Sequence, residues 1–215
     1  MNRLVLAVVC LTGVVAVAEE NAKVEDGFVS LFDGKSLNGW EGKEGMFRVA
    51  DGAIVAGSMK EKIPNNEFLC SRDKYGDFEL RLQAKLVGQG DNAGVQFRSE
   101  RIPNHHEVIG YQCDIGRMGD KPIWGWLYDE SRRRTFLVEG DAKKLGDVVK
   151  KDGWNDIVIR CEAARIQIWV NGLQTVDYRE ADDKIARTGV LGLQIHSGPP
   201  AEASYRHIRL KKLTP

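Results

Sequence analysis

Four short segments of the chain place hydrogen-bonding and aromatic side chains opposite their apolar residues. The segments read GVQFRSE, GYQCDIG, WGWLYDE and VLGLQIHSG. Side chains of a β-strand alternate between its two faces, so apolar residues that enter a core leave their neighbours pointing outward. The predicted outward residues are Gln96, Arg98, Gln112, Asp114, Trp126, Tyr128, Gln194 and His196. Such a set suits a sugar, whose hydroxyls need donors and acceptors and whose C–H faces stack on aromatic rings.

The same pattern has a plainer interpretation, in which these strands do not share a sheet and their outer faces are only solvated. The sequence leaves both interpretations open. The segment from Asp129 to Arg134 is either an ion-paired loop or a rim that orders a ligand. The pair His105-His106 is a weak metal candidate, because adjacent side chains of a strand point apart. No zinc-ligand spacing and no acidic cluster that compels calcium is present, so neither a metal nor a cofactor is predicted.

Period-two patterns dominate the chain and predict the strands that must position these residues. Phe78 to Leu86 alternates apolar and polar residues over the length of a good strand. Asp51-Gly52 and Asn171-Gly172 lie between apolar runs and predict hairpin turns. The stretch from Glu139 to Lys151 is charged and is expected to be a loop. Many short strands with glycine-rich turns predict an all-β sandwich or barrel in one domain.

The first residues predict the compartment. A short charged start precedes an apolar stretch from Leu4 to Val17, and Ala16-Val17-Ala18 has the small residues of a cleavage site. We therefore expect a signal peptide at 1–18, cleaved after Ala18, a lead-in at 19–27, a folded domain at 28–215, and a secreted or periplasmic protein. No second apolar segment is long enough to span a bilayer, so no membrane span is expected.

Charge and cysteine content narrow the range of partners. The chain has 31 basic and 31 acidic residues, and loss of the leader removes Arg3 to leave 30 and 31. This balance argues against electrostatic capture of nucleic acid. Cys70, Cys113 and Cys161 remain after cleavage, and their strand-like surroundings favour buried free thiols over a single disulfide between two of them. The oligomeric state is left open.

Several separated motifs together resemble one known family. They include FVSLFDGKSLNGW, YGDFELRLQAKL, DNAGVQFRSE, GYQCDIG, WGWLYDESRR and GVLGLQIHSGPP, in order between Phe28 and Leu213. This set resembles the 3-keto-disaccharide hydrolase family, formerly domain of unknown function 1080. The resemblance implies a two-sheet antiparallel jelly-roll sandwich of the concanavalin A-like type. It also implies an oligosaccharide or glycoside substrate already oxidised at the 3-position of the sugar.

One strand departs from the family pattern. The usual GYEVQILD appears here as GYQCDIG, so the usual Glu is Gln112 and the usual Gln is Asp114. Related jelly-roll glucanases carry two catalytic glutamates in an E-x-D-x-E strand, whereas the matching residues here are Gln112, Asp114 and Gly116. A retaining mechanism with two carboxylates from this strand is therefore not expected.

A 3-keto sugar can be cleaved without that pair, because the ketone acidifies the hydrogen on C2. A base removes this hydrogen, and the group on C1 then leaves with help from an acid. The expected roles are Asp114 or His196 as base, Arg98 at the ketone oxygen, and Tyr128 or His196 as acid. Gln96, Gln112 and Gln194 would orient hydroxyls, and Trp126 would be a stacking platform.

Two other functions compete with this enzyme hypothesis. A jelly roll can bind glycans without chemistry, as a lectin-like module, or act as an envelope interaction protein with a degenerate site. An enzyme needs Asp114 and His196 within reach of one sugar carbon, whereas a lectin needs only the amides and the aromatic residues. The sugar and its linkage are not specified by the sequence.

Overall fold

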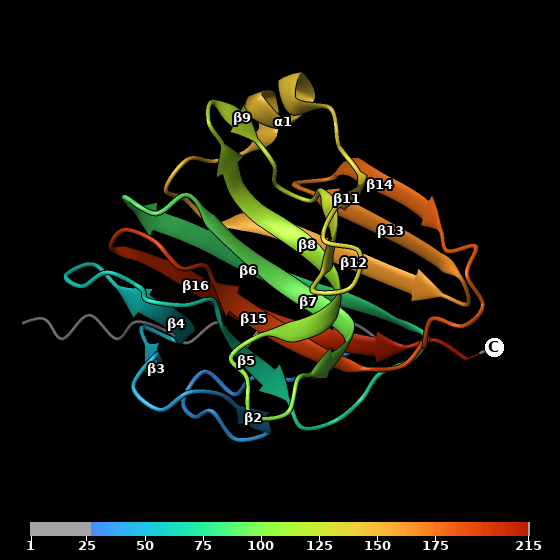
Figure 1. The fold of residues 1–215 in the computed structure, drawn as a ribbon, viewed down its shortest axis with the longest axis horizontal. Coiled ribbons are helices and arrows are strands. Elements are labelled where there is room, and N and C mark those ends of the chain that lie inside the picture. The colour runs from blue at the N-terminus through green and yellow to red at the C-terminus, as the bar shows by residue number, and fades with distance from the viewer. Residues whose placement is uncertain (1–26, 215) are drawn as a thin grey trace, which may run out of the picture.

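A computed structural model describes residues 27–214 as a sandwich of two antiparallel sheets (Figure 1). The predicted signal peptide at 1–18 and most of the lead-in lie outside the described residues. Each sheet has eight strands. The expectation of an all-β jelly-roll sandwich is confirmed, and within the described residues no helix is long and apolar enough to cross a bilayer.

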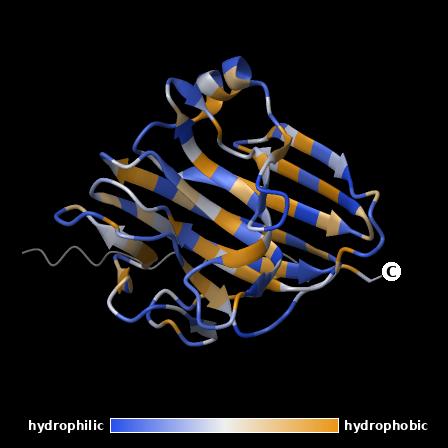
Figure 2. Ribbon diagram, viewed as in Figure 1, coloured by the Kyte–Doolittle hydropathy of each residue, from blue (hydrophilic) through white to orange (hydrophobic). Residues whose placement is uncertain are grey.

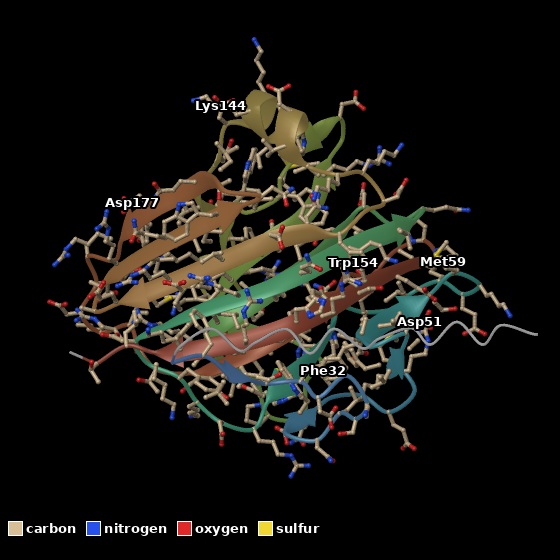
Figure 3. The ribbon with its side chains drawn as sticks, turned by 180° about the vertical axis from the view of Figure 1, so that it is seen from behind. Phe32, Asp51, Met59, Lys144, Trp154 and Asp177 are labelled. Carbon is tan, nitrogen blue, oxygen red and sulfur yellow. The ribbon has the colours of Figure 1, made fainter. Side chains whose placement is uncertain are left out.

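The first sheet has the strand order β14-β13-β12-β6-β16-β4-β3, with β1 paired to β16. Its strands are β1 (Val29–Ser30), β3 (Phe47–Ala50), β4 (Ala53–Ser58), β6 (Phe78–Gly88), β12 (Asn155–Glu162), β13 (Arg165–Val170), β14 (Leu173–Arg179) and β16 (Ala201–Lys212). Burial alternates residue by residue along β6 and β12, because one face packs on the core and the other meets solvent. Figure 3 looks onto this outer face, where Asp177 pairs with Arg165.

The second sheet has the order β11-β10-β8-β7-β15-β5-β2, with β9 paired to β8. Its strands are β2 (Trp40–Glu41), β5 (Glu67–Ser71), β7 (Asn92–Arg101), β8 (Val108–Met118), β9 (Lys121–Pro122), β10 (Leu127–Glu130), β11 (Phe136–Val138) and β15 (Val190–Ile195). Hydropathy alternates along many strands of both sheets (Figure 2), yet β7, β8 and β15 are buried at almost every position. The outer face of this sheet therefore holds polar side chains that are shielded from water.

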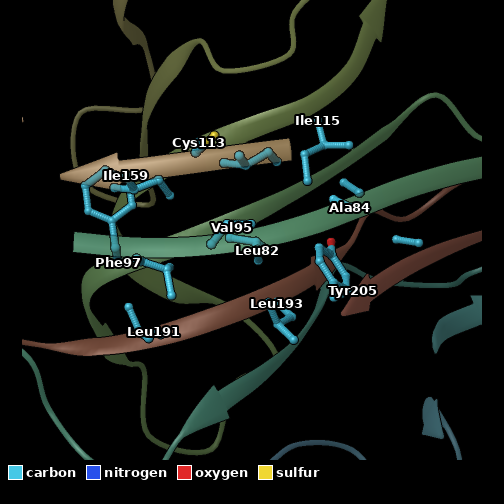
Figure 4. Packing of buried hydrophobic residues seen from close by; sticks show 14 of the residues in the cluster. Leu82, Ala84, Val95, Phe97, Cys113, Ile115, Ile159, Leu191, Leu193 and Tyr205 are labelled. Carbon is cyan, nitrogen blue, oxygen red and sulfur yellow. The ribbon is translucent and has the colours of Figure 1, made fainter. Parts of the chain in front are cut away.

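Apolar side chains from the two sheets meet in one core (Figure 4). The second sheet contributes Val95, Phe97, Cys113, Ile115, Leu191 and Leu193, and the first contributes Leu82, Ala84, Ile159 and Tyr205. Cys70, Cys113 and Cys161 are free and buried, as expected. At roughly 25 cal/mol for each Å² of buried apolar surface, this core is the main source of stability.

The loop expected from Glu139 to Lys151 contains a short helix, which corrects that prediction. The helix α1 spans Ala142–Val148. The Asp141 side chain caps its first turn by accepting from the backbone N–H groups of Lys143 and Lys144, and Leu145 is buried beneath it. One cap and one apolar anchor are enough for two turns, although no helical period extends far enough to predict them.

The charged segment from Asp129 to Arg134 is an ion-paired corner between β10 and the end of β14. Asp129 is fully buried and lies 2.8 Å from Arg132 Nη2 and 3.3 Å from Arg133 Nε. Arg133 also forms an ion pair with Glu180, with Nη2 2.7 Å from Oε2. The Tyr111 hydroxyl donates a hydrogen bond to the same carboxylate oxygen at 2.7 Å. Burial alone would raise the pKa of Glu180, but donors from Tyr111, Asp182 and Arg133 lower it to about 2.

We expect Glu180→Gln to lower the free energy of unfolding at pH 7 by about 1.5–3 kcal/mol, the range for hydrogen bonds to a charged group. Because the pKa of Glu180 is lower in the folded state, its stabilisation is present above the unfolded value of about 4.5 and is lost as the pH falls through about 2. Urea titrations at pH 7 and pH 3 measure this difference. Glu162→Gln, which removes an exposed partner of Arg160, is the control and should cost less than about 1 kcal/mol. Equal losses for the two variants would contradict the assignment.

Candidate functional site

The register of the second sheet brings most of the predicted polar residues onto one outer face. Directly opposed residues of neighbouring strands share a face. Gln96 lies opposite Gln112, and Gln112 lies opposite Tyr128, so these three form one row across β7, β8 and β10. The next row runs from Gln194 through Gly94 to Asp114.

Hydrogen bonds connect these rows into a chain of amides that ends at a carboxylate. The Ser99 hydroxyl lies 2.8 Å from Gln96 Oε1, and Gln96 Nε2 donates to Gln112 Oε1 at 2.7 Å. Gln112 Nε2 then donates to Asp114 Oδ1. Gly94 makes room for this arrangement, because a Cβ at that position would lie 2.6 Å from Gln112 Cδ. Each amide is thus oriented by the previous one, and the last N–H fixes Asp114.

Asp114 is 3 % exposed and has no cationic partner within the described residues. The pKa of Asp114 is raised from 3.8 to about 7, mainly by burial; the Gln112 hydrogen bond opposes this rise and the negative charge of Glu130 adds to it. A carboxyl group with a pKa near neutrality can both take and release a proton at physiological pH.

Glu130 is a second carboxyl group on this face, although the sequence predicted it only as part of the charged segment from Asp129 to Arg134, either an ion-paired loop or a rim that orders a ligand. It lies two positions beyond Tyr128 on β10, opposite Gly110 of β8, so it points to the same side as Tyr128. Burial raises the pKa of Glu130, as does the charge of Glu107, whereas His196 and Arg134 lower it. The alternation of WGWLYDE, followed from Tyr128 to the last residue of this segment, is the signal that would have found Glu130.

Gln194 is fully buried, and neither its Oε1 nor its Nε2 has a hydrogen-bond partner. A buried amide without partners costs about 1–3 kcal/mol for each unsatisfied group, so such a residue needs an explanation. From the core side, the Tyr205 hydroxyl bonds to the backbone carbonyls of Gly94 at 3.1 Å and Gln194 at 2.5 Å. The backbone beneath the amide is therefore fixed, while the amide itself is left without a partner.

His196 lies at the end of β15 and is half-buried. Its Nδ1 is 2.8 Å from the Ser197 carbonyl oxygen, which can only accept, so the Nδ1 proton points there and Nε2 is the free acceptor of the neutral ring. The Ser197 N–H donates to Asn66 Oδ1 at 2.9 Å, and Asn66 Nδ2 donates to Glu107 at 3.1 Å. Asn66 thereby holds the β15–β16 loop and the β7–β8 hairpin together beside the site.

Two predicted site residues lie elsewhere. Arg98 sits at a β-bulge with φ of 46°, and its guanidinium bonds to Asp77 and to the carbonyl oxygens of Gly76 and Ala163. Trp126 precedes β10, is 2 % exposed, and packs edge-on against Phe136 in the core, with centroids 5.2 Å apart. Arg98 therefore links the sheets, and Trp126 offers no exposed ring on which a sugar could stack.

No group of three or more potential metal ligands occurs in the part of the chain that the structure describes. The weak candidate His106 instead bonds to the Asn66 carbonyl oxygen, and its ring stacks on that of His105. The chemistry of this face is therefore assigned to carboxyl, amide, imidazole and phenol groups.

One curated protein resembles part of the chain in sequence. A curated 3-keto-disaccharide hydrolase from Bacteroides thetaiotaomicron is 28% identical over 85 residues, which make up 36% of this chain and 29% of that protein. The chain thus matches less than a third of that relative's length.

Solved structures resemble the chain over most of its length. A putative glycosyl hydrolase from Parabacteroides distasonis has a TM-score of 0.65 at 19% identity, covering 87% of this chain and 95% of that one. The carbohydrate-binding module CBM66 from Bacillus subtilis has a TM-score of 0.61 at 13% identity, covering 81% and 96%. At these identities the likeness concerns the fold. The model of the 3-keto-alpha-glucoside-1,2-lyase-like domain matches residues 27–211, so the chain belongs to this carbohydrate-active family.

Proposed function

We propose that this protein cleaves glycosides whose sugar carries a ketone at C3, by elimination across C1 and C2. The observation that carries the proposal is Asp114, a buried carboxyl group with a pKa of about 7 at the end of an oriented amide chain. The family to which the chain belongs and the curated relative are both named for 3-keto glycosides or disaccharides, which supports this substrate class.

In the proposed reaction, Asp114 takes the proton from C2, and the C–H electron pair moves to form an enolate with the C3 ketone. The enolate then collapses, the C1–O bond breaks, and the leaving alkoxide takes a proton from an acid. The product is an unsaturated 3-keto sugar with a C1=C2 bond, and addition of water to C1 would complete hydrolysis. Atoms and electrons balance without an oxidant, because the ketone is already present in the substrate.

The remaining roles follow from the chemistry of neighbouring groups. Gln194 Nε2 is a buried donor without a partner, so it is suited to bond the developing enolate oxygen or a hydroxyl. Arg134 replaces Arg98 as the arginine whose charge acts on this face, since it opposes the rise in pKa that burial causes at both Tyr128 and Glu130. Glu130, with its raised pKa, is the proton donor to the leaving group, and His196 lies near enough to favour ionised Glu130 when the imidazole carries a second proton.

Asp114→Asn should reduce kcat for a 3-keto glycoside by on the order of a hundredfold or more, the scale expected for loss of a general base. Asn keeps an oxygen acceptor for Gln112, so substrate affinity should change less. Steady-state kinetics measure both effects, and Asp183→Asn, at an exposed ion pair, is the matched control. Unchanged turnover in Asp114→Asn would remove Asp114 from the mechanism, and retained glycan binding without any turnover in the wild type would favour a lectin-like module.

Activity and stability should depend on pH in opposite directions. Because the ionised form of Asp114 is the base, kcat/KM should rise with pH as Asp114 ionises near pH 7, and loss of the proton from the acid Glu130 should give a descending limb. The protonated form is favoured in the folded state, so the stability that Asp114 contributes is present below the unfolded pKa of about 3.8 and is lost as the pH rises through about 7. Asp114→Asn should therefore gain stability relative to wild type between pH 4 and pH 8 in urea titrations. A constant difference over this range would contradict the raised pKa.

Gln194→Met should separate binding from stability. Met has nearly the shape of Gln but needs no hydrogen bonds, so the free energy of unfolding should rise by about 1–2 kcal/mol. Loss of the amide should raise KM for a 3-keto glycoside by about tenfold, the equivalent of one hydrogen bond of about 1.4 kcal/mol. Gln174→Met, at an exposed position of the first sheet, is the control for both measurements. A destabilised Gln194→Met variant with unchanged KM would show that the amide has a structural role.

A further inference from the structure

A cleft of about 680 Å³ lies at the end of the sandwich where β8 leads into β9. Figure 1 shows α1 and β9 together at this end of the molecule. The cleft is bounded by the β6–β7 turn, the start of β9, α1 and the loop that follows α1, and its lining includes Leu86, Gly116, Arg117, Asp120, Trp124 and Gly146. Its volume is within the range of about 300–1,000 Å³ that small-molecule sites occupy.

Several glycines line the cleft, and they differ in whether a side chain could replace them. Gly88 has φ of 110°, and a Cβ there would lie 2.6 Å from the Pro200 carbonyl oxygen. Gly116 has φ of 127° and lies against the Asp91 carbonyl group. Gly146 is different, because nothing lies within 4 Å of the position its Cβ would occupy. The backbone therefore requires Gly88 and Gly116, whereas a side chain could be added at position 146.

The lining combines an apolar wall with charges of both signs. Trp124 and Leu86 supply apolar surface, and Asp91, Asp120, Asp152, Arg117 and Lys151 surround it. Within residues 27–214, none of these five charged side chains forms an ion pair or a side-chain hydrogen bond. Three carboxylates and two cations do not select strongly for an anion or a cation. They can, however, bond to many hydroxyl groups, so the chemistry suits a neutral, hydroxylated ring.

The cleft is adjacent to the strand that carries Asp114. Gly116 lines the cleft and lies two positions from Asp114 on β8, on the same face and about 7 Å away along the strand. The segment with Trp124 is bound to β8 on both sides, by Ile123 N–H to the Gly116 carbonyl at 2.9 Å and Gly125 N–H to the Asp114 carbonyl at 2.8 Å. A group attached to a sugar at Asp114 can therefore extend toward the cleft.

We propose that this cleft binds the neutral, hydroxylated leaving group of the substrate, such as the second sugar of a 3-keto disaccharide. This inference rests on the proposed function, because it places the 3-keto sugar at Asp114. It assigns specificity for the leaving group to residues outside the reacting face, among them Arg117, Asp120 and Trp124.

The test compares two substrates that differ only in the leaving group, a 3-keto disaccharide and the methyl 3-keto glycoside of the same sugar. Gly146→Phe should partly fill the cleft and raise KM for the disaccharide by tenfold or more, with less than a twofold change for the methyl glycoside. Gly146→Ala, which adds one methyl group in open space, should leave both values unchanged. A second variant, Arg117→Ala with Asp120→Ala, should raise the disaccharide KM selectively because it removes polar partners at exposed positions. No selective change in either variant would overturn the proposal.

A direct binding measurement separates this inference from the proposed reaction. If the wild type cleaves neither substrate, the proposed function fails, and calorimetric titration with the disaccharide then tests the cleft alone. Binding to the wild type that Gly146→Phe weakens at least tenfold would support the cleft as a site for hydroxylated ligands. Absence of binding to the wild type, or equal binding to the two proteins, would overturn it.

Discussion

The packing of the two sheets against each other fixes the direction of every side chain on β7, β8 and β15. Val95, Cys113 and Leu193 are buried in the common core, and moving any of these strands by one residue would exchange them for polar neighbours. On β8 the exchange would put Gln112 and Asp114 into an apolar layer, at a cost of several kcal/mol. The polar face is therefore positioned by the core behind it, and Tyr205 adds hydrogen bonds from that core to the backbone of Gly94 and Gln194.

Burial of this polar face lowers the stability of the fold, and it also shifts the pKa of the Asp114 carboxyl group toward neutrality. An exposed Asp114 would have an ordinary carboxyl pKa and would be a weak base, whereas burial raises its pKa to about 7. Gln194 adds to this cost, because both its donor and its acceptor are buried without a hydrogen-bond partner. The ion-paired corner of Asp129, Arg133 and Glu180 has the opposite character, because its charges already satisfy one another. The two polar regions are adjacent on β10, yet the first has buried groups without partners and the second is held by ion pairs.

Alternation predicted the sandwich and much of the site because burial follows period two wherever a strand is regular. Gln112, Asp114 and Gln194 were assigned to the outer face correctly for this reason. Arg98 was misplaced because a β-bulge between Phe97 and Glu100 changes the direction of its side chain, and a single sequence carries no clear signal for a bulge. Trp126 was misplaced because it belongs to the turn after Gly125, which has φ of 71°, where alternation does not apply. Burial of the outer face itself depends on contacts between distant segments, such as Asn66 with Glu107, that periodicity cannot predict.

The structure gives a physical meaning to the departure from the family pattern at Gln112 and Asp114. Positions 112 and 114 share one face of β8 and are joined by a hydrogen bond, so exchanging the amide and the acid between them keeps one carboxylate on this face. A carboxylate at both positions would place two charges in a buried region beside Glu130, and their repulsion would raise the pKa of each further. With Gln at 112, the side chain can accept from Gln96 and donate to Asp114, which a carboxylate could not do. The amide at 112 thus orients the Asp114 carboxylate, which lies about 7 Å along the strand from position 112, toward the cleft beside β9.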